Sequence, residues 1–257
     1  MASIDLNGER LGYDRAGSGE KLLLIHSLGT AAWLWREQIR RWSAHFDVIA
    51  VDARGHGRSS REGGFTVRNV AADMAAVLEA FGGTPARVVA ISMGGPIAAH
   101  LADIAPHLVS RLVITDSFAD QGEAGATRAA AIAKAISEGS MEAYARQYTA
   151  DTLVEDGEPA HAEELTASIA GMSAEAYIEA AQSVFTANVT DLYAKIAVPS
   201  LVVVGSRDNR TPPKLSQDIA ALIPGAGYAE IEGARHLANL DRPDAFHAAI
   251  DPFLLAR

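Results

Sequence analysis

The sequence predicts an α/β fold in which a mostly parallel, doubly wound sheet is covered by helices. Short aliphatic runs alternate with amphipathic segments of helical length along most of the 257 residues. The aliphatic runs are hydrophobic on both faces, as parallel strands between two helical layers are. Such alternation implies right-handed crossovers. A helical stretch without strands between residues 117 and 188 predicts a lid inserted between two core strands.

The predicted elements follow in chain order. Two short runs on either side of Gly8, within residues 2–16, indicate an antiparallel hairpin on the sheet edge. The buried strands expected next are Lys21–His26, Asp47–Asp52, Arg87–Ile91, Arg111–Thr115 and Ser200–Gly205, with a shorter strand-like run at Tyr228–Ile231. The helices expected around them are Ala32–Ala44, Val67–Phe81, Gly95–Ala105, Pro213–Leu222 and Pro243–Leu255.

The segment from 117 to 188 is rich in Ala and Glu. Its expected helices are Ala126–Glu138, Met141–Tyr148, Ala160–Ala170 and Ala174–Ala187. We therefore divide the chain into a core domain, residues 1–116 and 189–257, and a helical cap, residues 117–188. The alternative interpretation is a plain helical layer with no gating role.

Composition narrows the possible functions. The 22 basic and 32 acidic residues give a net charge of −10, which argues against a nucleic-acid or anionic-membrane surface. Without cysteine, disulfides, thiolate chemistry and cysteine-ligated zinc are excluded. No signal peptide is visible, and no apolar run nears the ~20 residues that cross a bilayer. We expect a soluble cytoplasmic protein without metal or cofactor, whose oligomeric state the sequence does not indicate.

A candidate nucleophile stands in the stretch AISMGG, residues 90–95. Ser92 follows a buried-type strand, and Gly94-Gly95-Pro96 opens a helix. A serine on such a turn adopts a strained backbone conformation that exposes its hydroxyl, and small residues two before and two after it relieve the crowding. The usual signature is G-x-S-x-G, whereas Ala90 occupies the first glycine position here. A serine without a catalytic role at a strand end is the alternative.

A nucleophilic serine requires a base, and histidine is the side chain best suited to this near neutral pH. Of the eight histidines, His236 lies in a loop before the last helix, and this loop can return to the carboxyl edge of the sheet. Asp208, at a strand's carboxyl end, is the expected acid. Asp116, at the end of the preceding core strand, is its rival. Asp52 is expected to hold its own loop in shape.

The oxyanion of an acyl-transfer intermediate requires backbone donors near the nucleophile. The Met93 N–H lies at a helix N-terminus, where negative charge is favoured. The second expected donor is the Leu28 N–H in the loop HSLGT, to which Ser27 adds a hydroxyl. His26 is expected to be a structural turn residue.

With these residues identified, the chain resembles the α/β-hydrolase superfamily from end to end. The matching blocks, in order, are LLIHSLGT, VIAVDARGHGRSS, AISMGGPIAAHLA, LVVVGSRDNRTPP and ARHLANLDRPDAF. The motifs HSLGT, SMGG and HLAN look most similar to those of 3-oxoadipate enol-lactonases. The resemblance implies Ser92 as nucleophile, Asp208 as acid, His236 as base, and Leu28 and Met93 as oxyanion donors.

The expected reaction is hydrolysis of a small ester or lactone through an acyl-enzyme. An enol-lactone of this family is also a carboxylate, so a cation in the lid would help to bind it, and Arg128 and Arg146 are the candidates. The same fold and triad serve C–C bond hydrolases of ring-cleavage products, general carboxylesterases and cofactor-free perhydrolases. Some members of the fold bind small signals without turnover, but a complete triad favours an enzyme.

Overall fold

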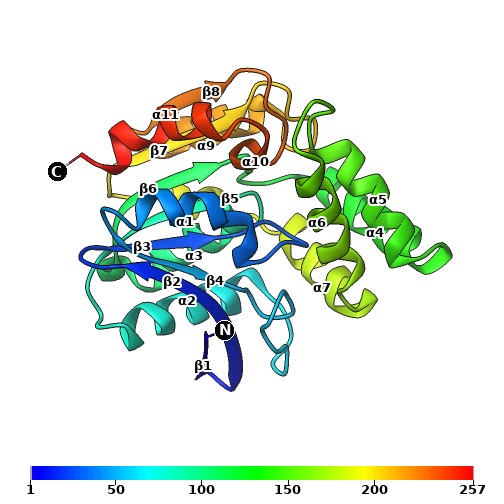
Figure 1. The fold of residues 1–257 in the computed structure, drawn as a ribbon, viewed down its shortest axis with the longest axis horizontal. Coiled ribbons are helices and arrows are strands. Elements are labelled where there is room, and N and C mark those ends of the chain that lie inside the picture. Colours follow the sequence, from blue (N-terminus) through cyan, green and yellow to red (C-terminus); the bar gives the residue numbers. More distant parts are fainter. Residues whose placement is uncertain (1, 257) are drawn as a thin grey trace.

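An eight-stranded sheet forms the centre of the computed structural model, which describes residues 2–256 (Figure 1). Its strand order is β1-β2-β4-β3-β5-β6-β7-β8. The strands are β1 Ala2–Leu6, β2 Glu9–Gly17, β3 Lys21–Ile25, β4 Asp47–Val51, β5 Ala86–Ile91, β6 Val109–Thr115, β7 Ser200–Gly205 and β8 Gly227–Ile231. The pairs β1–β2 and β2–β4 are antiparallel and the others are parallel. The hairpin therefore lies at the edge of the sheet, as predicted.

Helices cover both faces of this sheet. The longer ones are α1 Arg36–Trp42, α2 Val67–Ala80, α3 Gly94–Ile104, α9 Pro213–Leu222 and α11 Pro243–Leu254. Four single-turn elements are η1 Ala32–Trp35, η2 Pro106–Leu108, α8 Thr190–Tyr193 and α10 Ala238–Asp241. The helix expected over Ala32–Ala44 thus begins as a 3₁₀ turn. Among residues 2–256, no helix combines the length and the apolar character needed to cross a membrane.

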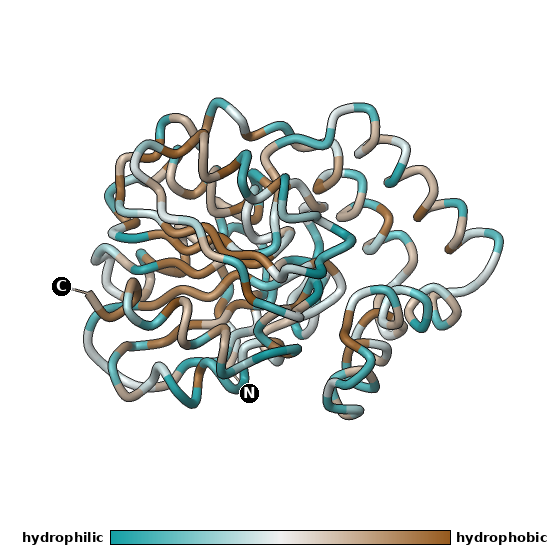
Figure 2. The backbone as a smooth tube through the Cα atoms, turned by 90° about the horizontal axis from the view of Figure 1, so that it is seen from above, coloured by the Kyte–Doolittle hydropathy of each residue, from teal (hydrophilic) through white to brown (hydrophobic). Residues whose placement is uncertain are grey.

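The hydrophobic core lies between the sheet and its helices, where Figure 2 shows the hydrophobic backbone segments concentrated. Every residue of β3, β4 and β7 is buried. Burial on both faces explains why these strands read as continuous aliphatic runs rather than as alternating patterns. Trp35 and Trp42 pack with Phe246 of α11, which joins the first and last helices over the sheet.

Four of the helices between β6 and β7 form a separate layer beside the sheet, at the right of Figure 1. They are α4 Gly122–Glu138, α5 Met141–Thr152, α6 Pro159–Ala170 and α7 Ala174–Phe185. Residues 117–188 contain no strand. Ser140 and Ser173 cap α5 and α7 by accepting the N–H groups of Ala143 and Ala176. Helix α5 extends four residues beyond the expected Tyr148, to Thr152. We refer to these four helices as the cap.

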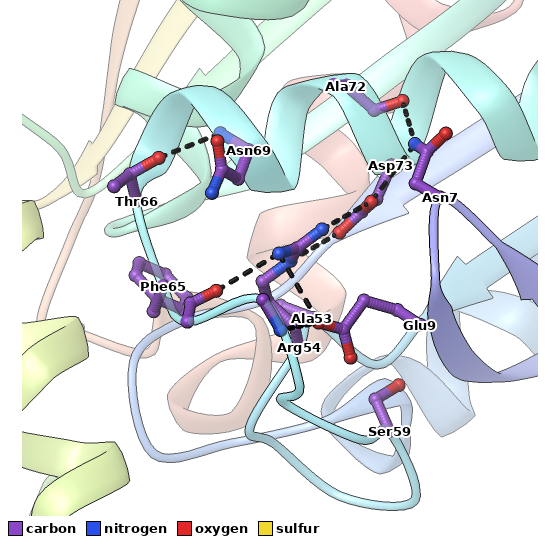
Figure 3. A network of polar contacts seen from close by, with 12 residues as sticks. Asn7, Glu9, Ala53, Arg54, Ser59, Phe65, Thr66, Asn69, Ala72 and Asp73 are labelled. Carbon is purple, nitrogen blue, oxygen red and sulfur yellow. Dashed lines mark hydrogen bonds and ion pairs between the residues drawn. The ribbon is translucent and has the colours of Figure 1, made fainter.

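A buried ion network fixes the long loop after β4 (Figure 3). The Arg54 guanidinium makes two hydrogen bonds of 2.8 Å to the Asp73 carboxylate in α2, and it lies 3.4 Å from Glu9 in β2. The side chains of Arg54, Asp73 and Glu9 are only 6%, 0% and 1% exposed. The far end of the loop reaches the cap, because the Phe65 N–H donates to Glu179 in α7. The network therefore fixes a loop that supports the cap.

Candidate active site

Ser92 occupies a sharp turn between β5 and α3. Its φ of 55° is in the left-handed region, which a residue with a side chain adopts at a cost in free energy. The turn is held on both sides: the Ser92 N–H donates to the Thr115 carbonyl at 2.9 Å, and Ser117 Oγ donates to the Ser92 carbonyl at 2.8 Å. Strand β6 and the residues after it thus keep Ser92 in this strained conformation.

The small residues around the turn have different roles. A Cβ added to Gly94 would lie 2.6 Å from the Ile25 carbonyl oxygen, which is closer than any real contact of this kind. A Cβ on Gly95 would collide with the Ser117 side chain. Ala90 is fully buried in β5. Because Gly94 has no side chain, there is room beside it for the Ala90 methyl group. The structure therefore forms the sharp turn with alanine at this position.

Three side chains from three strand ends meet at this turn. His236 Nε2 lies 2.9 Å from Ser92 Oγ, and His236 Nδ1 lies 2.9 Å from Asp208 Oδ2. Ser92 follows β5, Asp208 follows β7 and His236 follows β8. All three are buried, and Ser92 is the most accessible at 8% exposure. The geometry allows a proton to pass from the hydroxyl to the imidazole while the carboxylate orients the ring.

The surroundings of Asp208 and His236 determine the protonation state of each. Burial by itself would raise the pKa of Asp208, but His236 and hydrogen bonds from Thr211 outweigh it and hold that pKa below its ordinary value. The Thr211 hydroxyl lies 2.7 Å from Asp208 Oδ2, and the N–H groups of Arg210 and Thr211 donate to Oδ1. Burial is the main reason why the pKa of His236 lies below its usual value, and the charges of Arg210 and Arg128 add to it. Asp208 is thus ionised and His236 neutral near pH 7.

The rival acid, Asp116, does not contact the histidine. It is fully buried at the end of β6 with a φ of 49°, and its Oδ1 accepts the Gly205 N–H at 2.8 Å. Within residues 2–256, its Oδ2 has no hydrogen-bond partner. Burial, and then the charge of Asp208, raise the pKa of Asp116 well above its ordinary range. The surroundings of Asp116 therefore disfavour its ionised form, and its contacts give it no direct role beside His236.

Two backbone N–H groups that the sequence predicts as oxyanion donors have no partner among the described residues. Within the described residues, 2–256, neither the Leu28 N–H nor the Met93 N–H makes a hydrogen bond. Met93 caps the N-terminus of α3, and Leu28 lies in the buried loop after β3. The cap supports that loop, because Ser168 Oγ in α6 donates to the Gly29 carbonyl at 2.8 Å. Both N–H groups therefore remain free to bind a further acceptor. Ser27, directly before Leu28, has a buried hydroxyl that has no partner in the same described chain.

Two other polar residues near this loop are structural. His26 Nε2 accepts the Ala53 N–H at 2.9 Å, and burial lowers the pKa of the ring, so His26 is a neutral acceptor. Asp52 accepts the N–H groups of Ala32 and Arg58 at 2.7 and 3.0 Å. These contacts join the loops after β3 and β4, in agreement with the interpretation of both residues from the sequence.

Two arginines lie close together beside the acid and base. Arg128 in α4 donates to the Arg210 carbonyl at 2.8 Å, and Arg210 directly precedes Thr211. The Arg128 guanidinium carbon lies 4.4 Å from the centre of the Phe185 ring, and that of Arg210 lies 3.9 Å from the centre of the Tyr148 ring. Such stacking orients guanidinium groups without neutralising them. We call these two residues the arginine pair.

The arginine pair lacks an anionic partner among the residues that the structure describes. In the described chain, residues 2–256, no carboxylate oxygen lies within 4.0 Å of either guanidinium group. Arg210 Nε is buried and without a hydrogen-bond acceptor among the same residues. Burial, and then the nearby charge of Arg210, lower the pKa of Arg128. Two partly buried like charges therefore lie close together without a compensating carboxylate in the part of the chain that the structure describes.

Tyrosines complete the surroundings of the arginine pair. Tyr144 and Tyr177 place their hydroxyl oxygens 3.3 Å apart, and the Tyr144 ring contacts the Tyr148 ring. Tyr177 is also so close to Gly29 that a Cβ there would lie 3.0 Å from its ring. The tyrosines therefore connect the arginine pair with the loop that carries the Leu28 N–H. Sequence reasoning selected Arg128 but missed Arg210, although Arg210 lies in the same motif as Asp208.

The structure does not bring Arg146 to this site. Its side chain is 73% exposed on α5 and pairs with Glu142, one helical turn earlier, at 2.7 Å. Both Arg128 and Arg146 stand in helices of the cap. Only the packing of α4 against its neighbours distinguishes them, because it turns Arg128 toward Phe185 and Arg210.

Comparison with known proteins agrees with this architecture. Residues 21–243 match the alpha/beta hydrolase fold family, and the chain belongs to that family. Over 248 residues it is 30% identical to 3-oxoadipate enol-lactonase 2 of Acinetobacter baylyi, covering 94% of this chain and 91% of that protein. The crystal structure of the enol-lactonase from Burkholderia xenovorans LB400 superposes with a TM-score of 0.91 at 26% identity, over 99% of this chain and 100% of the other.

A second solved structure gives the same result. A hydrolase from Pseudomonas aeruginosa PA01 is 29% identical and superposes with a TM-score of 0.88, covering 99% of this chain and 98% of that one. Together with the family match, these relatives support hydrolase activity.

Proposed function

We propose that this chain is a serine hydrolase that cleaves a small ester or lactone, in the manner of a 3-oxoadipate enol-lactonase. The observation that carries the proposal is the pair of 2.9 Å contacts of His236, to Ser92 on one side and to Asp208 on the other. In the proposed first half-reaction, His236 Nε2 takes the Ser92 proton while Oγ attacks the substrate carbonyl. The N–H groups of Leu28 and Met93 hold the oxyanion.

Collapse of the tetrahedral intermediate breaks the bond to the leaving oxygen, which receives the proton from His236. In a lactone this oxygen stays attached, so the acyl-enzyme carries the whole substrate. His236 then removes a proton from water, the resulting hydroxide attacks the ester, and Ser92 recovers its proton as the acid product leaves. Asp208 remains ionised throughout and stabilises the imidazolium that forms in each half.

The arginine pair supports a substrate that carries a carboxylate. A guanidinium group binds a carboxylate through charge-assisted hydrogen bonds, and the tyrosine hydroxyls beside it are further donors. A neutral ester would leave both charges without a partner. We therefore propose Arg128 and Arg210 as the residues that bind the anionic end of the substrate, with its reactive carbonyl at Ser92.

A substrate panel tests the proposed function against the other activities of the fold. It contains a carboxylated enol-lactone, the methyl ester of that lactone, a p-nitrophenyl ester, a vinylogous diketone, and acetate with hydrogen peroxide. Our proposal predicts the highest kcat/KM for the carboxylated lactone. Preference for the diketone would indicate a C–C bond hydrolase, and preference for peroxide would indicate a perhydrolase. Binding of the lactone without turnover would identify a non-catalytic binder and contradict the proposal.

Removal of one charge from the arginine pair gives a sharper test. We expect Arg210→Met to raise KM for the carboxylated lactone by about 10- to 100-fold, because it removes a hydrogen bond between charged groups. The KM for the methyl ester should change by less than about threefold. Arg146→Met is the matched control, since it removes an exposed charge from the same cap, and it should leave both values unchanged. Equal effects of Arg210→Met on both substrates would exclude a role in binding the anion.

The pH profile should follow the ionisation of His236. The base acts only when neutral, so kcat/KM should fall as the pH falls through the pKa of His236. Burial and the arginine pair lower that pKa, so the midpoint should lie below the ordinary value of histidine, about 6.5. Arg210→Met removes one of the cations and should move the midpoint upward when the neutral methyl ester is the substrate. A midpoint that moves downward in this variant would contradict the assignment.

A further inference from the structure

The backbone around His236 is bonded to the C-terminal end of α5 in the cap. The His236 N–H donates to the Thr152 carbonyl at 3.3 Å. The Arg235 guanidinium donates to the carbonyls of Ala150 and Leu153 at 3.2 and 2.9 Å. The last carbonyls of a helix have no partner within the helix, and a cation there also interacts favourably with the helix dipole. The end of α5 and the loop of the base thus satisfy each other's hydrogen bonds.

Asp241 joins the same two segments through its side chain. Its Oδ1 accepts the N–H of Val154, just after α5, at 3.1 Å, and its Oδ2 accepts the N–H of Arg235 at 2.7 Å. The residue is only 6% exposed, so water competes little for either donor. Hydrogen bonds that a carboxylate accepts from backbone N–H groups are stronger than those between neutral groups. One buried carboxylate therefore ties the cap to the residue that precedes His236.

We infer that Asp241 is a positioning residue for His236, which holds the base against the end of α5. This inference rests on the proposed role of His236 as the general base. The ring makes two contacts of 2.9 Å from opposite nitrogens, so a shift of its backbone lengthens at least one of them. Misplacement of a catalytic group by about 1 Å can cost 10²-fold in rate.

Helix α5 also connects this contact with the arginine pair. Tyr148, one turn before Thr152, stacks on Arg210. Arg210 of the arginine pair therefore contacts the helix whose end holds the base. A movement of this end of α5 would therefore displace the His236 loop as well.

Asp241→Asn is the variant that tests the inference. It keeps the size of the side chain but places an amide N–H against one of the two backbone donors, so one hydrogen bond is lost. We expect kcat to fall by about 10- to 100-fold for each active site, with KM changed by less than about threefold. Active sites are counted by stoichiometric labelling of Ser92 with a fluorophosphonate, so unfolded protein does not enter the rate. Arg235→Met removes the contacts to the α5 carbonyls and should lower kcat in the same way. This variant replaces Asp241→Asn as the test of the contact with α5 if Asp241→Asn does not fold.

The matched control is Asp156→Asn. Asp156 lies in the same linker after α5 and pairs with Arg242 at 2.9 Å, but its side chain is 71% exposed. Its replacement removes the same charge without freeing a backbone donor near His236. The kcat and KM of this variant should equal those of the wild type.

A second readout does not depend on turnover. The imidazole proton between His236 Nδ1 and Asp208 should give a downfield NMR signal in the wild type and in Asp156→Asn. This signal should broaden or shift in Asp241→Asn. An unchanged signal together with wild-type kcat for each labelled site would overturn the positioning role, even if the variant were less stable. The proposed function would instead be overturned if the wild type neither labelled at Ser92 nor hydrolysed any substrate. In that case the NMR comparison would still decide whether Asp241 positions His236.

Discussion

Ser92→Ala is expected to lower kcat for the best lactone or ester by about 10⁴- to 10⁶-fold, the range seen when the nucleophile of a serine hydrolase is removed. The loss is large because the proposed reaction runs through a covalent bond to Oγ. The fold should be retained, because the contacts that hold the turn use the Ser92 backbone N–H and carbonyl rather than its hydroxyl. Single-turnover kinetics and thermal unfolding of the purified variant measure the two quantities separately.

The two neighbouring aspartates provide the control for this prediction. Asp208→Asn should lower kcat by about 10⁴-fold, because an amide cannot stabilise the imidazolium and favours the wrong tautomer. Asp116→Asn replaces a carboxyl group that does not contact His236 and whose pKa is raised by burial, so kcat should change by less than about tenfold. A larger loss for Asp116→Asn than for Asp208→Asn would reverse the assignment of the acid. Retained hydrolysis in Ser92→Ala would contradict the mechanism as a whole.

Arg54→Met is expected to reduce the free energy of unfolding by about 3–5 kcal/mol, the cost of breaking a buried ion pair from one side. The variant leaves the carboxylates of Asp73 and Glu9 buried without their cation. Hydrogen bonds from Asn7 and Ser60 remain, but they do not replace a full charge. Urea unfolding followed by circular dichroism measures the difference, provided that the transition is two-state.

Arg10→Met is the matched control for Arg54→Met. Arg10 pairs with Asp5 at 3.5 Å, but both side chains are mostly exposed, and such pairs contribute little to stability. Its unfolding free energy should stay within about 1 kcal/mol of the wild type. If Arg54→Met were equally harmless, the network in Figure 3 would not be what holds the loop after β4.

The sheet could be predicted closely because its strands are continuous aliphatic runs. The expected Ser200–Gly205 and Pro213–Leu222 agree with β7 and α9 at both ends. The prediction ends helix α5 at Tyr148, short of Thr152, because it relies on apolar residues to mark the buried face. Thr149 and Thr152 are polar, yet both are buried. The one-turn helices α8 and α10 are too short to produce a periodic pattern.

The candidate site likewise has one part that local sequence predicts and another that depends on packing between distant segments. Ser92, Asp208 and His236 each follow a strand, and in a parallel sheet the carboxyl ends of strands meet at one edge. Their approach could therefore be predicted from local sequence. The arginine pair depends on how α4 and α5 pack over the loop after β7, and nothing local to Arg210 signals that its charge has no partner. The bonds of Asp241 to Val154 and Arg235 likewise join distant segments.

Covalent labelling of the wild-type chain tests the central claim most directly. The protein is treated with a fluorophosphonate, digested, and its peptides are analysed by mass spectrometry. The mechanism predicts one adduct for each chain, on Ser92, formed at a rate that falls with protonation of His236 and lost in Ser92→Ala. An adduct on another residue, or no adduct in a preparation that hydrolyses its substrate, would contradict it.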